Sequence, residues 1–177
     1  MQLETKNLYL HPLDAGDAPA LFYYRSDRSV YRFHNWKPTT VNDAVRFIEK
    51  SAFGETLRQG HWNQLGIFLK ESGELIGDLG IHPFEEKQTE IGFTISPLFQ
   101  QKGYGVEAVK RVMQYLFREN NFYRIIARTH PENQGSMSLL KKLGFRQEGH
   151  FTKSSYIDGV WQDDLLFAIL DNEFKES

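Results

Sequence analysis

The sequence predicts a mixed α/β or α+β fold, with helices packed on both faces of one sheet. Between residues 65 and 95, apolar residues recur with the period of strands, and three such segments follow one another with no helix between them. Runs with the 3.6-residue period of helices precede and follow this region. Strands in direct succession favour antiparallel pairing, so the helical runs on either side are expected to cover the sheet.

The N-terminal part is expected to hold a short strand and two helices. Residues 8–10 form an apolar run that ends at Pro12. Residues 14–24 indicate a helix with Asp14 at its N-cap, and Thr-Val-Asn-Asp at 40–43 matches a capping box that opens a second helix. Gly60 is expected to end this second helix. Its apolar face consists of Ala44, Val45, Phe47, Ile48 and Ala52.

The remaining elements are predicted from the periodicity of apolar residues and from turn residues. Strands are expected over 65–69, 74–82 and 90–95, with a hairpin turn at 71–73 and a stop at Pro97. After them come a helix over 105–119, a strand over 124–129, a helix over 133–142 closed by Gly144, and a strand pair over 145–151 and 161–170. No linker or repeat interrupts this order, so residues 1–177 are expected to form a single domain.

Composition excludes several classes of function. A net charge of -2 gives no basic field for nucleic acid, and no apolar run approaches the roughly 18 residues that span a bilayer. The chain has no cysteine, which excludes disulfides and a cysteine nucleophile and fits a reducing compartment. The six histidines show no metal-ligand spacing. We therefore expect a cytoplasmic protein with no nucleic-acid or membrane partner and no metal.

The most informative segment is the loop Gln-Gln-Lys-Gly-Tyr-Gly-Val at 100–106, between a predicted strand and a predicted helix. Such a loop points several backbone N–H groups at one place, and the start of the helix adds free donors and the positive end of its dipole. Gly103 and Gly105 leave room for a pyrophosphate to approach the backbone. The loop therefore predicts a phosphate-binding site.

Two other phosphate motifs fit this loop less well. A Walker A loop needs Gly-x-x-x-x-Gly-Lys-Ser/Thr, which is absent. Gly103, Gly105 and Ala108 satisfy the Gly-x-Gly-x-x-Ala of a dinucleotide fingerprint. In that fold, however, the strand runs directly into the first glycine, whereas here Pro97 ends it six positions earlier. The position about 20 residues further on is Tyr123 rather than an acid.

The third possibility is an acyl-CoA. The pattern Gln100-x-x-Gly103-x-Gly105 resembles the Gln/Arg-x-x-Gly-x-Gly/Ala motif of the GNAT superfamily of acyl-CoA N-acyltransferases. Flanking motifs resemble its ribosomal-protein N-terminal acetyltransferase branch, and the likeness covers nearly the whole chain. They lie at residues 27–47, 90–93, 133–136, 142–145 and 159–163. The resemblance implies a mainly antiparallel sheet, splayed in the middle to hold acetyl-CoA, and a possible homodimer.

The resemblance also implies which residues contact acetyl-CoA. The backbone of residues 93–95 would bind the pantetheine arm as an added strand, and the loop would bind the pyrophosphate. Asn133 and Ser136 would lie near the thiol end, although Asn133 equally suits a helix N-cap. The expected cofactor-binding residues are Phe93, Thr94, Ile95, Gln100, Gln101, Lys102, Gly103, Tyr104, Gly105, Val106, Asn133 and Ser136. Lys102 also suits a solvated surface, and Tyr104 also suits packing.

Direct transfer requires a neutral amine and a proton for the leaving thiolate. A lysine amine with a pKa near 10.4 is only about 0.1% neutral near pH 7.4, whereas an α-amine with a pKa near 7.9 is about a quarter neutral. Glu90, on the strand that would carry the thioester, is the candidate base, and Ser136 is the candidate proton donor to the thiolate. Both also suit ordinary surface roles, as do His82 and His130, which lie at strand ends.

The acceptor site is expected on Phe33, His34, Asn35 and Trp36 and on a loop over 156–161, although these aromatic residues also suit the core. No dense acidic cluster favours a polyamine there. The predicted function is an acetyl-CoA-dependent N-acetyltransferase that acts on an α-amine of a protein or peptide. A small-molecule amine is the alternative acceptor, and a non-catalytic acyl-CoA-binding module is the alternative class.

Overall fold

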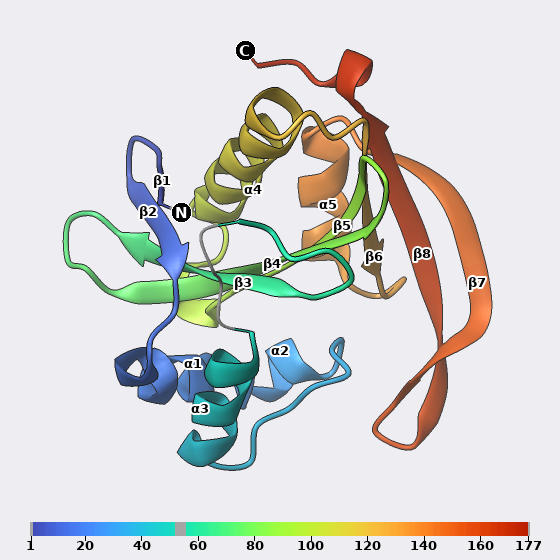
Figure 1. The fold of residues 1–177 in the computed structure, drawn as a ribbon. Coiled ribbons are helices and arrows are strands. Elements are labelled where there is room, and N and C mark those ends of the chain that lie inside the picture. Colours follow the sequence, from blue (N-terminus) through green and yellow to red (C-terminus); the bar gives the residue numbers. More distant parts are fainter. Residues whose placement is uncertain (1, 52–55, 177) are drawn as a thin grey trace.

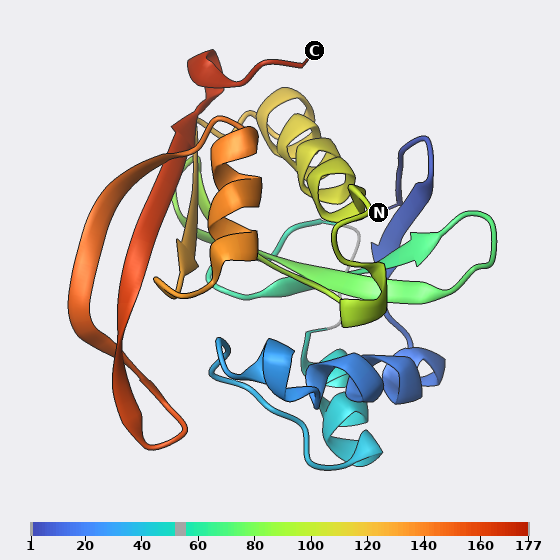
Figure 2. The same ribbon diagram turned by 180° about the vertical axis from the view of Figure 1, so that it is seen from behind.

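The computed structural model describes residues 2–51 and 56–176. These residues form an eight-stranded sheet in the order β1-β2-β3-β4-β5-β6-β8-β7, antiparallel except between β5 and β6. Helices α4 and α5 cover one face, and α1, α2 and α3 lie on the other (Figures 1 and 2). The mixed fold with helices on both faces is thereby confirmed.

The strands are β1 (Leu3–Glu4), β2 (Leu8–Pro12), β3 (Asn63–Leu69), β4 (Leu75–Glu85), β5 (Gln88–Ile95), β6 (Arg124–Thr129), β7 (Arg146–Ile157) and β8 (Val160–Leu170). The helices are α1 (Ala18–Arg25), α2 (Arg28–Tyr31), α3 (Val41–Lys50), α4 (Tyr104–Gln114) and α5 (Gln134–Lys142). Short helical turns are η1 (Ala15–Asp17), η2 (Pro97–Phe99), the π-helical η3 (Tyr115–Glu119) and η4 (Asp171–Glu173). None of the helices in the described ranges is long and apolar enough to cross a membrane.

Side-chain caps place the N-terminal helices. Thr40 forms the predicted capping box with Asp43, which starts α3. Asp14 caps η1, a single turn that leads into α1. The expectation that Gly60 ends the second helix is wrong, because α3 ends at Lys50 and Gly60 lies in the loop before β3 with a φ of +73°. Ala52, which was assigned to this helix, lies outside the described residues.

The C-terminal hairpin is longer than its sequence pattern suggested. The first strand was expected to end at Phe151, but β7 continues to Ile157 through two shifts of register with β8. Residues 156–161 are therefore the tip of a hairpin rather than a separate loop. Asp158 and Gly159 turn the chain there, both with positive φ (48° and 80°). An Asp-Gly pair is the usual signature of such a turn.

Two apolar cores lie on the two faces of the sheet. The larger core packs α4 and α5 against the strands, with Ile91, Val109 and Phe167 almost without solvent exposure. The smaller core joins α1 and α3 to the strands through residues such as Leu21, Ile48 and Phe68. Because both faces are covered, the expected cofactor would have to enter where the sheet itself opens.

The sheet opens between β5 and β6. These parallel strands pair only at Gln88 with Arg124, Thr89 with Ile125, and Glu90 with Ile126. Beyond Glu90, β5 continues to Ile95 and β6 to Thr129, with no further pairing between them. The sheet is thus splayed in its middle, as expected.

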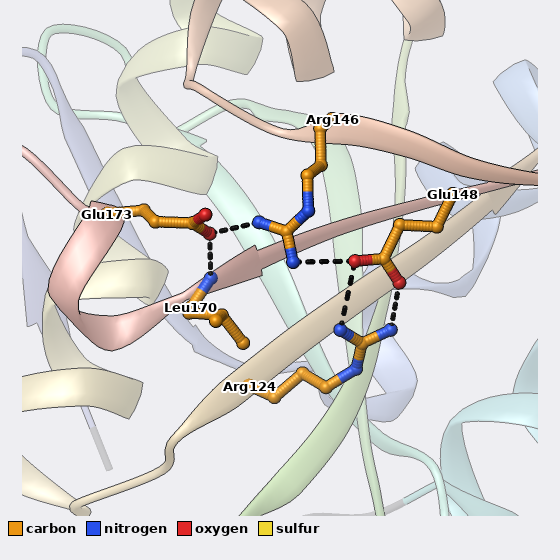
Figure 3. Close-up of polar contacts among 5 residues, drawn as sticks. All are labelled: Arg124, Arg146, Glu148, Leu170 and Glu173. Atoms are coloured by element: carbon orange, nitrogen blue, oxygen red, sulfur yellow. Dashed lines mark hydrogen bonds and ion pairs between the residues drawn. The ribbon is translucent and has the colours of Figure 1, made fainter.

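An ion-pair network fastens the closed end of this split (Figure 3). Arg124, the first residue of β6, binds the Glu148 carboxylate, with one N···O distance of 3.2 Å. Arg146 donates to Glu148 at 2.6 Å and also pairs with Glu173, which accepts from the Leu170 backbone N–H at 2.8 Å. The network joins β6, β7 and η4, so it holds together the half of the sheet beyond the split.

Candidate active site

The loop before α4 leaves backbone donors free. Gly103 is the N-cap of α4 and has a φ of +86°, which favours glycine. No side chain caps this helix, and a Cβ at Gly103 would meet no atom within 4 Å. Gln101 also has a positive φ, of 61°. The first N–H groups of α4 and the helix dipole therefore face open space that an anion can occupy.

Gly105 lies where α4 packs against α5 and β5. A Cβ there would lie 2.9 Å from Leu139 Cδ1 of α5 and 3.4 Å from Ile95 Cγ1 of β5. The absence of a side chain at Gly105 therefore also lets the first turn of α4 lie close to its neighbours. Gln100 fixes the start of the loop, because its Nε2 donates to the Ile95 carbonyl at 2.9 Å.

Two other loop residues have less specific surroundings. Lys102 is exposed, with its Nζ 5.1 Å from the centre of the Phe99 ring. Tyr104 is half-buried and packs against the larger core. Val106 is also half-buried, in the first turn of α4. The loop therefore offers an anion mainly backbone donors, with one exposed cation beside them.

β5 presents two different faces to the site. Phe93 and Ile95 pack against the larger core, whereas Glu90, Gly92 and Thr94 lie on the opposite face, which carries α1 to α3. The strand edge that faces β6 has no partner beyond Glu90. An extended pantetheine arm suits such an edge, because its amide groups can form hydrogen bonds with the backbone of β5 as an added strand does.

Two hydroxyl groups lie on elements that flank the split, one on α5 and one at the end of β6. Asn133 caps α5, since its Oδ1 accepts from the Ser136 N–H at 3.1 Å. Ser136 is half-buried in the first turn of this helix. Thr129, at the end of β6, has a buried Oγ1 with no hydrogen-bond partner among the described residues. Thr129 was not found from the sequence, and its unsatisfied hydroxyl is suited to a polar ligand group.

The uncapped start of α4, the unpaired edge of β5 and the unsatisfied Thr129 hydroxyl at the end of β6 belong to elements that flank the split of the sheet. The start of α4 suits a pyrophosphate, the edge of β5 suits an arm that contains amide groups, and the hydroxyl suits the polar groups near a thiol. The residues present therefore fit a CoA thioester.

Glu90 lies at the point where β5 and β6 part. It is opposite His82 on β4, and its Oε1 is 3.8 Å from Arg128 Nε. Burial raises the pKa of the Glu90 carboxyl, while the charges of Arg128 and His82 oppose that rise. A raised pKa makes the carboxylate a stronger base, and the charge of Arg128 limits the rise.

Trp62 forms a wall beside Glu90 that the sequence analysis missed. Gly80 and Gly92 are paired across β4 and β5, and the Trp62 indole lies over both. A Cβ at Gly80 would be 2.8 Å from the indole, and one at Gly92 would be 3.7 Å from it. The indole also stacks on His82 with 5.1 Å between ring centres. In the sequence, only Gly80 and Gly92 could have indicated this wall. That the two glycines lie side by side beneath an aromatic ring follows only from the register of β4 and β5.

His34 stands on the other side of Gly92. Its Nε2 is 3.4 Å from Thr94 Oγ1. Burial, and then the charge of Arg25, lowers the pKa of His34 to about 3, so its ring is neutral at physiological pH. Below it, buried Asp78 accepts from the Tyr24 hydroxyl at 2.8 Å and from Arg25 Nε at 3.0 Å.

The four residues expected at the acceptor site have different surroundings. Trp36 stacks on Phe47 at 4.2 Å and packs against the smaller core, and Asn35 is exposed. Phe33 lines a surface hollow, and its ring lies 5.4 Å from that of His130. Phe33 and His34 thus lie toward the candidate site, whereas Trp36 anchors the fold.

This hollow, of about 450 Å³, lies between three segments of the chain. They are the end of α2, the turn after β6, and the tip of the β7–β8 hairpin, which reaches past the sheet toward α2 (Figure 1). We call it the acceptor hollow. It is lined by Arg32, Phe33, His130, Pro131, Glu132, Lys153, Val160, Trp161, Gln162 and Asp163.

Comparison with known proteins agrees with this geometry. The profile of the Acetyltransferase (GNAT) domain matches residues 7–146. The chain is 33% identical over 176 residues to the uncharacterized N-acetyltransferase YnaD of Bacillus subtilis (strain 168), which covers 99% of this chain and 100% of that one. A crystal structure of a GNAT-family acetyltransferase from Bacillus anthracis matches with a TM-score of 0.87 at 28% identity, over 98% of this chain and 100% of that one.

A ribosomal protein uS5-alanine N-acetyltransferase of Escherichia coli (strain K12) is 31% identical over 115 residues, which are 63% of this chain and 59% of that enzyme. Fold, split sheet and sequence matches thus define one class of protein, the acetyl-CoA-dependent N-acetyltransferases. The chain belongs to the GNAT acetyltransferase family.

Proposed function

We propose that this enzyme transfers the acetyl group of acetyl-CoA directly to the α-amine of a protein or peptide. The observation that carries the proposal is the acceptor hollow, which is open to solvent, bordered by exposed Trp161 and Val160, and rimmed by Arg32 and Lys153. An open border of this kind admits the end of a chain. The uS5-alanine relative is named for an acceptor of this class.

The available base also suits an α-amine. Near pH 7.4 a lysine amine loses about 4 kcal/mol because so little of it is neutral, whereas an α-amine loses less than about 1 kcal/mol. Glu90 is half-buried and close to Arg128, so it is a base of moderate strength. An acceptor that is already largely neutral matches such a base.

The proposed reaction follows from the positions of these groups. The amine nitrogen attacks the thioester carbonyl carbon, a C–N bond forms, and the C–S bond then breaks. A backbone N–H on the free edge of β5 stabilises the oxyanion, a contribution of roughly 3–4 kcal/mol for one well-placed donor. Glu90 takes the amine proton through a water molecule, and the Ser136 hydroxyl relays a proton to the departing thiolate.

Release of free thiol from acetyl-CoA, with peptides of different N-termini, tests this proposal. Glu90→Gln is expected to lower kcat at least about 100-fold, and Ser136→Ala about tenfold, while acetyl-CoA still binds. Glu74→Gln on an exposed turn and Ser138→Ala on the exposed side of α5 are matched controls. Mass spectrometry locates the acetyl group. The proposal fails if only small amines are acetylated, and the assigned roles fail if both variants retain the parent rate.

A further inference from the structure

Two arginines stand one helical turn apart at the rim of the acceptor hollow. Arg28 begins α2, Arg32 follows its last residue, and both side chains are exposed. Arg32 lines the acceptor hollow and also an adjoining one, which Arg28 and Ser29 complete. Like charges four residues apart on a helical turn repel by a few tenths of a kcal/mol. The pair therefore weakens this short helix slightly instead of stabilising it.

No carboxylate in the part of the chain that the structure describes pairs with these two arginines. Within residues 2–51 and 56–176, neither guanidinium makes an ion pair or a hydrogen bond. The Arg32 guanidinium lies 4.3 Å from the centre of the Phe33 ring, which leaves its N–H edge free. The adjacent Asp27 is engaged with Ser29, accepting from its N–H at 2.8 Å and its hydroxyl at 2.6 Å.

Arginines elsewhere on the surface contrast with these two. Arg118, Arg124 and Arg146 each pair with carboxylates at exposed or half-exposed positions. Arg28 and Arg32 thus differ from these three arginines, whose charges are already paired with carboxylates.

The opposite rim of the acceptor hollow adds a third cation. Lys153, on β7, is exposed, and its charge interacts with that of Asp163, which also lines the hollow. Its backbone N–H donates to Asp163 at 2.9 Å, and Asp163 is also 2.7 Å from His150 Nε2, so this lining carboxylate is already engaged. Glu132 adds a second carboxylate, so within the lining Arg32 and Lys153 are balanced by Glu132 and Asp163. The excess positive charge at this rim comes from Arg28, which lies beside Arg32 in the adjoining hollow.

We propose that the acceptor is an acidic N-terminal segment, with Asp or Glu side chains shortly after its first residue. This inference rests on the proposed function. The amine enters the split near Glu90, and the following carboxylates pair with Arg28 and Arg32 at one rim of the acceptor hollow. Arginine suits this task because its planar N–H fork binds a carboxylate in a bidentate manner.

Peptides of about eight residues with one common N-terminal residue test the inference in the intact enzyme. Three versions carry Asp, Ser or Lys at the third to sixth positions. The acidic peptide is expected to exceed the neutral one at least about tenfold in kcat/KM, with the lysine peptide lowest. This advantage should shrink as salt rises from about 50 to 300 mM, because rim charges are screened.

Charge reversal identifies the groups responsible. The double variant Arg28→Glu, Arg32→Glu is expected to invert the order of the acidic and lysine peptides. Lys175→Glu reverses one charge at an exposed position and should keep the order. The C-terminal end of the chain, to which it belongs, lies away from α2 (Figure 1). Equal kcat/KM for the three peptides, or an acidic preference that survives the double reversal, overturns the inference while peptide acetylation stands. Thiol release with simple amines but with no peptide rejects the proposed function and the inference together.

Discussion

At the scale of single residues, Glu90 has a raised pKa that limits its use as a base at low pH. Only the ionised form accepts a proton, so kcat/KM is expected to fall as the pH drops through this pKa. Arg128 opposes the effect of burial, and therefore Arg128→Gln should move the acid limb of the pH profile to higher pH. The matched variant Arg46→Gln, at an exposed position on α3, should leave the acid limb of the pH profile where it is. An unshifted limb in Arg128→Gln would rule out this electrostatic coupling.

The same residue makes a prediction about stability. The pKa of Glu90 is higher in the folded protein than in the unfolded chain. Protonated Glu90 therefore contributes to the free energy of unfolding at low pH, and this contribution is lost as the pH rises through the folded-state pKa. At neutral pH the ionised carboxylate therefore weakens the fold. Glu90→Gln is expected to raise Tm at about pH 7 by a few degrees, with the gain shrinking as the pH falls toward about 4. Thermal melts across this pH range, with Glu74→Gln as the control, distinguish the effect from a general loss of charge.

Trp62 is the other residue whose side chain we propose borders the acceptor. Its indole is 43% exposed and lies over the paired Gly80 and Gly92. It also stacks on His82, which is paired with Glu90 across β4 and β5. Trp62→Ala is expected to raise the KM for the acceptor about tenfold, with little change in acetyl-CoA affinity, and Trp62→Phe should restore part of the loss. Tyr23→Ala removes a ring that is 68% exposed on α1 and serves as the control. A lower Tm with an unchanged acceptor KM would show that the indole is only structural.

At the scale of elements, local chemistry determined which boundaries could be predicted. The capping box at Thr40, the Asn133 cap and Gly144 each act within a few residues, so α3 and α5 begin, and α5 ends, where the sequence indicated. The end of α3 and the length of β7 depend on tertiary contacts and were misjudged. In the site, Gly103 and Glu90 carry local signals, whereas Trp62 and Thr129 gain meaning only from strand register and from burial.

Gly77 shows how register constrains the strand that carries the site. A Cβ there would lie 2.3 Å from the Thr94 carbonyl oxygen and 3.2 Å from Ile95 Cα, both backbone atoms of β5. Gly77→Ala must therefore push β4 away from β5, and a loss of about 1–3 kcal/mol is expected, together with weaker acetyl-CoA binding. Gly135→Ala in α5, where the nearest atom is Asn133 Oδ1 at 3.8 Å, should be neutral or stabilising. Urea unfolding of both variants measures the difference, and equal stability would contradict the register argument.

At the scale of the whole molecule, acetyl-CoA would link three elements that the chain brings together from distant positions. The start of α4, the free edge of β5 and the start of α5 meet at the split only when the sheet is folded, so the ligand should bind the native state alone. At about 100 times its dissociation constant such a ligand adds about 2.7 kcal/mol, or roughly 5–11 °C in Tm for a domain of this size. NAD also carries an adenosine pyrophosphate but lacks an arm that can pair with β5, so it should shift Tm far less. Gly103→Val places a side chain where φ is +86° and should reduce the acetyl-CoA shift more than it lowers the Tm of the free protein. Equal shifts with acetyl-CoA and NAD would mean that the phosphate loop alone binds the ligand, and that the split of the sheet adds nothing to recognition.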